Sequence, residues 1–278
     1  MKIYLIVNRD KKSCIEAAKN ICNELLKFSC EIFTDSDTAK ENNVFCDDKA
    51  IEKCEFAISV GGDGTLLHRA AILAQYDIPV VGINLGRVGF LTQLELNEIH
   101  LLKDLFEKNY TVQERMLLDI SVIRKNEKIA EFTALNDGVI GKGSLSRLVD
   151  VCVYCDSKKV SDYHADGIIV CTPTGSTAYS FSAGGAVIDP SVNAIGVTPI
   201  CAHCVTARPI IFNPNSVLNI EIPEQRLKEI YLTVDGLQGF ELCHGDRVEF
   251  IKSKKVLKLI SLKNDINFYA TLNSKLGI

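Results

Sequence analysis

The chain has 278 residues, of which 47% are hydrophobic and 24% charged, a balance that supports a sizeable globular core. Its net charge is −4 and it has no basic block, which argues against a nucleic-acid partner. Apolar runs stay well short of the ~18 residues that a membrane-spanning helix needs, so no membrane association is expected. Met1–Val7 is too short for a signal peptide and predicts a first strand.

Residues 1–112 alternate between strand and helix patterns, which predicts a parallel, doubly wound, Rossmann-like α/β domain. In such sheets, ligands bind beyond the carboxyl ends of the strands. Ser13 and Glu16 have the spacing of a capping box at the start of the first helix. The predicted strands are Lys2–Val7, Cys30–Thr34, Phe56–Val60 and Ile78–Ile83, and the later helices are Leu66–Tyr76 and Ile99–Phe106.

Residues 113–262 are dominated by strands and predict a β-sandwich of two packed sheets. A hairpin is predicted around the turn Lys125–Lys128. Residues 263–278 form a separate segment, in which Ile266, Tyr269, Leu272 and Leu276 have helical spacing. We expect this helix to pack back on the first domain. The other predicted strands are Arg147–Cys155, Gly167–Cys171, Val217–Ile222, Ile230–Val234, Arg247–Ile251 and Val256–Leu262.

The eleven cysteines are scattered along the chain, which favours free thiols in a reducing cytoplasm, many of them acting as small core residues. Cys152 and Cys155 are three apart on a predicted strand and therefore point to opposite faces, so they cannot chelate one ion. Cys201, His203 and Cys204 lack a second pair at zinc spacing, and packing or loop thiols are favoured over a zinc site.

The stretch Gly61–Thr65, Gly-Gly-Asp-Gly-Thr, follows a predicted strand and precedes a helix. Glycines in such a turn bring backbone N–H groups together, and these favour an anion such as phosphate. A carboxylate repels phosphate, so Asp63 makes chemical sense as a general base or beside a divalent cation. A tight turn with Asp63 near a helix N-cap explains the same residues without any function. The stretch is neither a Walker A loop nor a dinucleotide fingerprint.

Two more polar segments interrupt the β-rich part. Asn136 and Asp137 offer donors and acceptors that suit vicinal ribose hydroxyls, although a hairpin turn explains this pair alone more simply. Residues 166–185 run from a strand into a loop rich in hydroxyls and glycine. Here the face of Tyr179 can stack on a purine, and the alternative is a Ser/Thr-rich turn that caps a short helix. A serine hydrolase fits poorly, because the closing glycine of a nucleophile elbow is missing after Ser176.

In this order, the three segments make the sequence resemble the NAD kinase family over nearly the whole chain. Gly-Gly-Asp-Gly-Thr is shared with diacylglycerol kinases and phosphofructokinases, whereas residues 166–185 are specific to NAD kinases. The resemblance implies transfer of the γ-phosphoryl of ATP to the 2′-hydroxyl of the adenosine ribose of NAD. It also implies an active site in a crevice between an α/β domain and a β-sandwich domain, a divalent cation such as Mg²⁺, and a cytoplasmic homodimer or homotetramer.

Positions in the family motifs imply roles for individual residues. Asp63 is the implied general base, and the implied phosphate-binding residues are Gly61, Gly62, Gly64 and Thr65. Asp166 is implied to contact NAD, with a contact across a subunit boundary as one option. The implied NAD-binding residues are Asp63, Gly64, Asn136, Asp137, Arg147, His164, Asp166, Thr177, Ala178, Tyr179, Ser180 and Ser182.

Alternatives stay open at this point. A diacylglycerol-type lipid kinase would share the first motif, and a non-catalytic NAD(P)-sensing module would need no carboxylate at a phosphate site. Leu237 stands where many members of the family have a glutamine that contacts the nucleotide, with Gln238 beside it. The sequence does not choose between ATP and polyphosphate as donor, between NAD and NADH as acceptor, or between dimer and tetramer.

Overall fold

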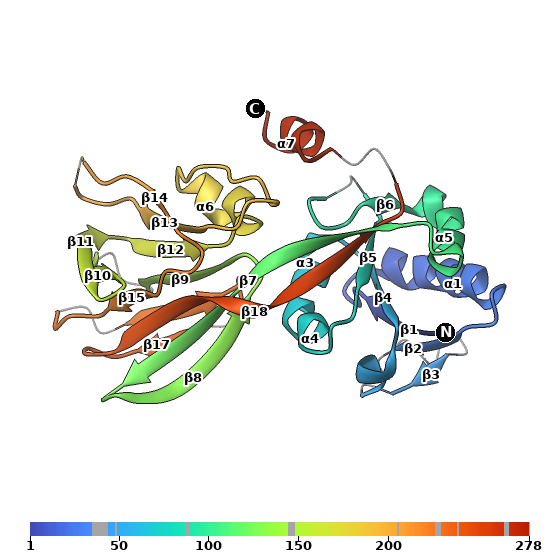
Figure 1. Cartoon of the computed structure of the whole chain (residues 1–278), viewed down its shortest axis with the longest axis horizontal. Coiled ribbons are helices and arrows are strands. Elements are labelled where there is room, and N and C mark those ends of the chain that lie inside the picture. Colours follow the sequence, from blue (N-terminus) through green and yellow to red (C-terminus); the bar gives the residue numbers. More distant parts are fainter. Residues whose placement is uncertain are drawn as a thin grey trace. The chain divides into compact units, whose positions relative to one another are not determined.

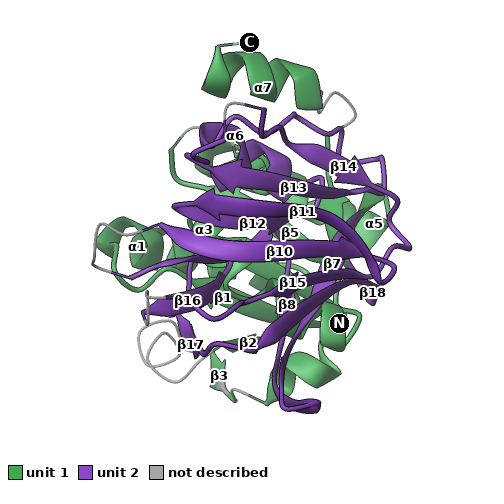
Figure 2. Cartoon of the chain, turned by 90° about the vertical axis from the view of Figure 1, so that its left-hand side faces the viewer, with its two compact units in different colours: residues 1–114, 257–278 green, residues 115–256 purple. Residues whose placement is uncertain are grey.

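The computed structural model describes residues 1–34, 44–47, 49–86, 89–143, 148–204, 206–225, 229–237, 239–263 and 267–277. The chain divides into two compact units, residues 1–114 with 257–278, and residues 115–256 (Figure 2). The divisions fall inside the long strands β7 (Thr111–Arg124) and β18 (Arg247–Ser261), so each of these strands contributes residues to both units.

The first unit is an α/β domain built on a parallel sheet with the order β18-β5-β4-β1-β2-β3 (Figure 1). β4 is buried along its whole length, which is typical of a parallel strand covered on both faces. Its further elements are β1 (Lys2–Val7), α1 (Lys12–Leu26), β2 (Glu31–Thr34), β3 (Phe45–Cys46), η1 (Ala50–Lys53), β4 (Phe56–Val60), α3 (Asp63–Leu67), α4 (Ala70–Gln75), β5 (Val80–Asn84), β6 (Leu94–Glu95), η2 (Leu96–Leu102), α5 (Lys103–Glu107) and α7 (Phe268–Leu276).

The strand order of this sheet reverses between β1 and β4. From β1 the chain moves outward to β2 and β3, and it then returns to β4 on the other side of β1. Ile21, Leu102 and Leu105 pack with β1 and β4 in one apolar core, so α1, η2 and α5 cover the same face. A reversal of this kind leaves a crevice outside the carboxyl ends of the two central strands, which is where open α/β sheets bind ligands.

Three helical details differ from the sequence expectations. α1 begins at Lys12 after the N-cap Lys11, so Ser13 lies inside the first turn and the predicted capping box is wrong. The predicted helix Leu66–Tyr76 is split into α3 and α4, because the N–H of Arg69 bonds the carbonyl of Leu66, three residues back, and ends the first helix. The predicted helix Ile99–Phe106 is a 3₁₀ segment, η2, that leads into α5.

Helix α7 belongs to the first unit, as expected. The centroid of its Phe268 ring lies 6.0 Å from the centroid of the Phe90 ring.

The second unit is a sandwich of two sheets, and side chains such as Ile120, Val151, Ile168 and Leu232 fill the core between them. One sheet has the antiparallel order β14-β13-β12-β9-β16-β17, and the other contains β11, β10, β15, β18, β7 and β8. Its elements not yet bounded are β8 (Glu127–Ala134), β9 (Asp137–Lys142), β10 (Val149–Cys155), β11 (Lys158–Ala165), β12 (Gly167–Cys171), η3 (Gly175–Thr177), α6 (Tyr179–Ser182), β13 (Ile195–Ile200), β14 (Ile210–Phe212), β15 (Leu218–Glu221), β16 (Ile230–Val234) and β17 (Phe240–Leu242).

Two sequence expectations for this unit have clear outcomes. The hairpin around Lys125 and Asn126 is confirmed as the β7–β8 pair. The two strands predicted at Arg247–Ile251 and Val256–Leu262 are a single strand, β18. The polar stretch between them contains no glycine or proline, and β18 continues through it with Ser253 buried.

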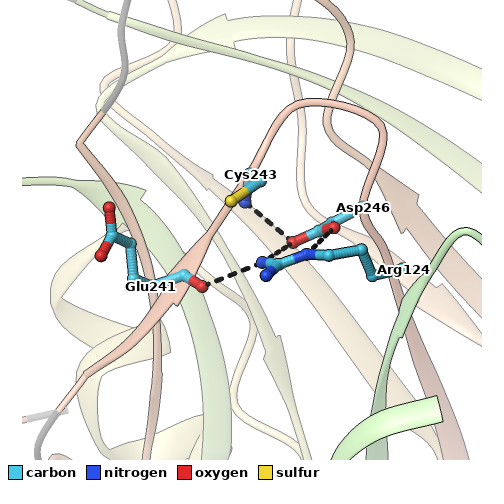
Figure 3. Close-up of polar contacts among 4 residues, drawn as sticks. All are labelled: Arg124, Glu241, Cys243 and Asp246. Atoms are coloured by element: carbon cyan, nitrogen blue, oxygen red, sulfur yellow. Dashed lines mark hydrogen bonds and ion pairs between the residues drawn. The ribbon is translucent and has the colours of Figure 1, made fainter. Parts of the chain in front are cut away.

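An ion pair anchors the turn that precedes β18 (Figure 3). The guanidinium of Arg124 donates from Nε and Nη2 to the two carboxylate oxygens of Asp246, at 2.8 and 2.7 Å, and Asp246 also accepts the N–H of Cys243. The Asp246 side chain is fully buried, whereas Arg124 is about one-third exposed. The pair therefore neutralises a carboxylate that water cannot reach.

Arg124→Met is expected to lower the free energy of unfolding by about 1–3 kcal/mol, because it leaves the buried Asp246 carboxylate without its counter-charge. Urea unfolding followed by circular dichroism measures this change. Lys128→Met is the matched control, since it removes an ion pair to Glu131 in which both side chains are at least half exposed. Equal urea midpoints for Arg124→Met and Lys128→Met would contradict a structural role for the Arg124–Asp246 ion pair.

Candidate functional site

A cavity of about 620 Å³ lies at the carboxyl ends of β1 and β4, where the strand order reverses. The cations Arg9, Lys11 and Arg69 line it, together with the carboxylate of Asp10. An excess of positive charge at a switch point favours a polyanion such as the phosphates of a nucleotide. The other residues that line the cavity are Ile6, Val7, Asn8, Gly62, Gly64, Thr65 and His68.

The predicted motif Gly61–Thr65 forms the turn from β4 into α3, beside this cavity. A Cβ at Gly61 would lie 2.3 Å from Thr65 Oγ1, so the turn requires glycine there. A Cβ at Gly62 or Gly64 would meet no atom of the described residues within 4 Å, which leaves their backbone open to a ligand. Asn8 Nδ2 donates to Thr65 Oγ1 at 3.3 Å and ties the end of β1 to the turn.

Asp63, the first residue of α3, is held by a loop that follows β5. Its Oδ2 accepts the N–H of Phe90 at 2.8 Å. Its Oδ1 accepts the N–H groups of Leu91 and Thr92, at 3.2 and 3.0 Å, and the Thr92 hydroxyl at 2.8 Å. The carboxylate is thus an acceptor with a fixed orientation.

In the second unit, the backbone of the Asn136–Asp137 segment is held by a carboxylate from a distant part of the chain. Asp235, which follows β16, accepts the N–H of Leu135 at 2.8 Å through Oδ2, and those of Asn136 and Asp137 at 2.8 and 3.1 Å through Oδ1. Asp137 begins β9 and is not part of a hairpin turn. Its carboxyl is buried, whereas Asn136 is half-buried.

The third segment, residues 166–185, packs directly on the Asn136–Asp137 segment. The N–H of Thr172 donates to the carbonyl of Asn136 at 2.8 Å, and the Thr172 hydroxyl donates to the carbonyl of Leu135 at 2.5 Å. A Cβ at Gly175 would lie 2.0 Å from the Asn136 carbonyl oxygen, so only glycine fits this close approach. Two segments that are some 40 residues apart in the sequence are therefore one structural unit.

The hydroxyls of the third segment divide into two groups. Those of Ser176 and Ser180 are buried and bond internally, Ser176 to the carbonyl of Pro173 at 2.6 Å and Ser180 to the Thr198 hydroxyl at 2.9 Å. Ser182 is exposed, and Tyr179 exposes 48% of its surface on α6. Half-buried Thr177, which bonds the carbonyl of Thr174, and half-buried Ala178 lie just before it. An exposed ring beside accessible small side chains can accept a planar base.

A second cavity, of about 300 Å³, brings Tyr179 together with Asp166, Lys142 and Tyr231. Lys142 Nζ donates to Asp166 Oδ1 at 2.5 Å. His164 lies on β11 and is not among the residues that line this cavity; its Nδ1 lies 2.6 Å from Asp150 Oδ1. Arg147 and Gln238 fall outside the described residues.

Comparison with known proteins is decisive. The model for the ATP-NAD kinase N-terminal domain matches residues 3–110, and that for the ATP-NAD kinase C-terminal domain matches residues 135–262. An NAD kinase of Thermoanaerobacter sp. (strain X514) is 38% identical over 99% of this chain and 98% of its own length. The chain belongs to the NAD kinase family.

Other proteins similar to this NAD kinase family member are also NAD or NADH kinases. An NAD kinase of Natranaerobius thermophilus is 43% identical over 81% of this chain and 78% of its own length. The crystal structure of yeast NADH kinase complexed with NADH matches with a TM-score of 0.90 and 25% identity, over 100% of this chain and 88% of that one. An NAD kinase from Archaeoglobus fulgidus in complex with ATP has the same fold, with a TM-score of 0.75, 24% identity and 98% coverage of both chains.

The cysteines of this NAD kinase family member are partly as expected. Of the ten that the structure describes, five are buried, and all ten are free thiols. Cys155 packs against the core of the sandwich, whereas Cys152 is bonded on the other side to Asp162, which agrees with opposite faces. Cys201 and Cys204 are exposed, so they are loop thiols and the packing interpretation is wrong for them.

Three polar side chains of the site were not predicted from the sequence. Asp235 was considered only as part of an altered motif, yet its carboxylate organises Leu135–Asp137. Thr92 bonds Asp63, and Lys142 bonds Asp166. Each of them lies at least 24 residues from its partner, and Thr92 lies in the loop between β5 and β6, so no pattern in the neighbouring residues pointed to these contacts.

The Asp137 carboxyl gives this family member a pH-dependent stability. Burial, followed by the charge of Asp235, raises the pKa of Asp137 to about 7. Because this pKa lies above that of an unfolded aspartate, the folded chain binds more protons between about pH 4 and pH 7. The free energy of unfolding therefore falls as the pH rises through that range.

Asp137→Asn removes this ionisation, so its free energy of unfolding relative to wild type should rise by on the order of 4 kcal/mol between about pH 4 and about pH 8. Urea unfolding at the two pH values measures the difference. Asp119→Asn is the control, because Asp119 is half-buried and accepts the Thr133 hydroxyl. The same difference in the free energy of unfolding between Asp137→Asn and wild type at both pH values would refute the raised pKa of Asp137.

Proposed function

We propose that this chain transfers the γ-phosphoryl of ATP to the 2′-hydroxyl of the adenosine ribose of NAD and so produces NADP. The observation that carries the proposal is that Asp63, a carboxylate held in a fixed orientation, stands in the chain between Gly62 and Gly64, which line a cation-lined cavity at the switch point of an NAD kinase fold. A pure NAD(P) sensor has no need for a carboxylate beside a phosphate site, and a lipid kinase has no need for the second-unit features described next.

The first unit binds the phosphates of ATP in this proposal. Arg9, Lys11 and Arg69 supply positive charge, and the open backbone at Gly62 and Gly64 supplies N–H groups without a Cβ in the way. The divalent cation, Mg²⁺ in our proposal, would be held mainly by the phosphates, since Mg²⁺ usually keeps several waters and takes only one or two protein carboxylates. Positioning and charge neutralisation are the main requirements of phosphoryl transfer.

The second unit binds NAD in this proposal. The amide of Asn136 and the carboxyl of Asp137 suit vicinal hydroxyls, and Tyr179 suits the face of the adenine ring. Ser180 acts indirectly, since its hydroxyl is buried against Thr198 and holds the segment in place. The other NAD contacts in the proposal are Asp63, Gly64, Arg147, His164, Asp166, Thr177, Ala178 and Ser182.

The chemical step needs a base because a ribose hydroxyl is a weak nucleophile near neutral pH. Asp63 takes the proton of the 2′-hydroxyl as its oxygen attacks the γ-phosphorus, and the bond to the ADP leaving group breaks. Such a base contributes typically ~10²–10⁴-fold to the rate.

We further propose a cytoplasmic homodimer or homotetramer. The free thiols among the described cysteines support a reducing compartment. No helix in the described residues is long and apolar enough to cross a membrane. Light scattering of the purified chain measures its assembly state.

A coupled assay tests the proposal directly: purified chain, NAD, ATP and Mg²⁺, with NADP read out by an NADP-specific dehydrogenase. Turnover of NAD is the expected result. A folded chain that binds NAD but forms no NADP with ATP or polyphosphate would favour a sensor, and phosphorylation of diacylglycerol in place of NAD would favour a lipid kinase. The same assay with NADH in place of NAD measures whether the chain also accepts NADH.

A further inference from the structure

We propose that Thr92 is a positioning residue for the base Asp63, that Asn84 sets the direction of the Thr92 hydroxyl, and that Oδ2 of Asp63 is the oxygen that receives the proton of the ribose. The inference rests on the proposed function and deepens it. It is carried by a chain of hydrogen bonds from the end of β5 to the first residue of α3.

Both hydrogen bonds of this series have ordinary donor–acceptor distances. Asn84 Nδ2 donates to Thr92 Oγ1 at 3.0 Å, and Thr92 Oγ1 donates to Asp63 Oδ1 at 2.8 Å. The Asn84 carbonyl oxygen accepts the N–H of Gly86 at 3.0 Å, which requires the amide nitrogen to face Thr92. Because the hydroxyl has one proton and accepts from Asn84, that proton points to Asp63.

Packing fixes the Thr92 side chain in this place. Thr92 is fully buried, and its carbonyl accepts the N–H of Gly89 at 2.9 Å. A Cβ at Gly82, on the adjacent strand β5, would lie 2.7 Å from the Thr92 Cα, so the two backbones touch. A Cβ at Gly89 would lie 1.9 Å from Asp63 Oδ1, so the loop also closes over the carboxylate. The contact is therefore made by a rigid part of the first unit.

The two oxygens of Asp63 are not equivalent. Oδ1 accepts three hydrogen bonds, from the N–H groups of Leu91 and Thr92 and from the Thr92 hydroxyl. From the residues that the structure describes, Oδ2 accepts one, from the N–H of Phe90. A carboxylate oxygen has about two lone-pair sites, so Oδ1 is saturated and Oδ2 keeps one site for an incoming hydroxyl. Thr92 thus anchors the oxygen that does not react.

Thr92→Val tests this role, because it removes the hydroxyl and keeps the shape of the side chain. We expect kcat to fall ~10–100-fold with the KM for NAD within about twofold of wild type. Thr92→Ser keeps the hydroxyl and should recover kcat to within about threefold.

Thr133→Val is the matched control, because Thr133 also donates to an aspartate, Asp119 at 3.1 Å, on strands β8 and β7 of the second unit. It should leave kcat unchanged. Asn84→Asp replaces the donor with an acceptor that attracts the Thr92 proton, so its kcat should fall like that of Thr92→Val. This variant decides the question if Thr92→Val does not fold.

The outcomes separate the inference from the proposed function. If wild type forms no NADP, the proposed function fails and the inference fails with it. If wild type is active, normal kcat in Thr92→Val or in Asn84→Asp overturns the inference alone. Equal losses in Thr92→Val and Thr92→Ser also overturn it, because the hydroxyl would then not be the cause.

Discussion

Asp63→Asn is expected to lower kcat for NADP formation by ~10²–10⁴-fold while NAD binding is largely kept. An amide cannot take the proton of the ribose hydroxyl. In the variant, the asparagine carbonyl oxygen takes the position of Oδ1 and the NH₂ group takes that of Oδ2. The NH₂ group then faces the N–H of Phe90, which donates to Oδ2 in the wild type, so two donors meet. Some loss of stability is therefore expected in addition to the lost base.

The measurement is the coupled assay at saturating ATP, with NAD binding measured separately by calorimetry and folding by circular dichroism. Asp119→Asn serves as the control, since it also changes a half-buried aspartate that accepts a threonine hydroxyl. Its kcat should equal that of wild type. Near-normal turnover in Asp63→Asn would remove Asp63 from the role of base.

Gly175→Ala is expected to lower the free energy of unfolding by about 3 kcal/mol or more, at the upper end of the range for overpacking. The new Cβ would lie 2.0 Å from the Asn136 carbonyl oxygen and 2.5 Å from its carbonyl carbon. Neither backbone can move aside easily, because Thr172 bonds the carbonyls of both Leu135 and Asn136.

Thermal unfolding should show this loss as a fall in Tm of roughly 6–12 °C. Gly141→Ala, on β9 of the same unit, is the matched control, since its Cβ would meet the Asp166 carbonyl oxygen at an ordinary 3.6 Å. We expect that variant to be as stable as wild type or slightly more stable. A Tm of Gly175→Ala close to that of the control would show that the two segments do not need this close approach. The affinity for NAD should fall together with the Tm, because the contact orders Asn136.

The longer parallel strands of the first unit were predictable because they are short runs dominated by apolar residues, whereas the two-residue strands β3 and β6 were missed. Phe56–Val60 was predicted with the bounds that the structure has, since a strand covered on both faces is mostly apolar; Ser59 is its one polar residue. Local signals failed where tertiary contacts override them. Ser13 has cap chemistry, yet α1 begins one residue earlier, and the lysine-rich stretch after Ile251 continues as strand because β18 is held by its neighbours in the sheet.

Parts of the site were predictable for a different reason. Gly61–Thr65 and residues 166–185 are continuous in the chain, so their chemistry can be read from adjacent residues. The hydrogen bonds that orient them come from far away: Thr92 lies 29 residues from Asp63, and Asp235 lies 99 residues from Asn136. A single polar residue in a loop or after a strand has no sequence feature that identifies its distant partner.

The sequence by itself determined the family, the order of an α/β part and a β-rich part, and the motifs that carry the chemistry, because these depend on neighbouring residues and on periodicity. Only the tertiary structure decided that Oδ1 of Asp63 is saturated, that Ser180 is buried against Thr198, and that Asp137 lies beside Asp235. Hydrogen-bond saturation, burial and charge proximity depend on distances between residues far apart in the chain, and folding alone sets those distances.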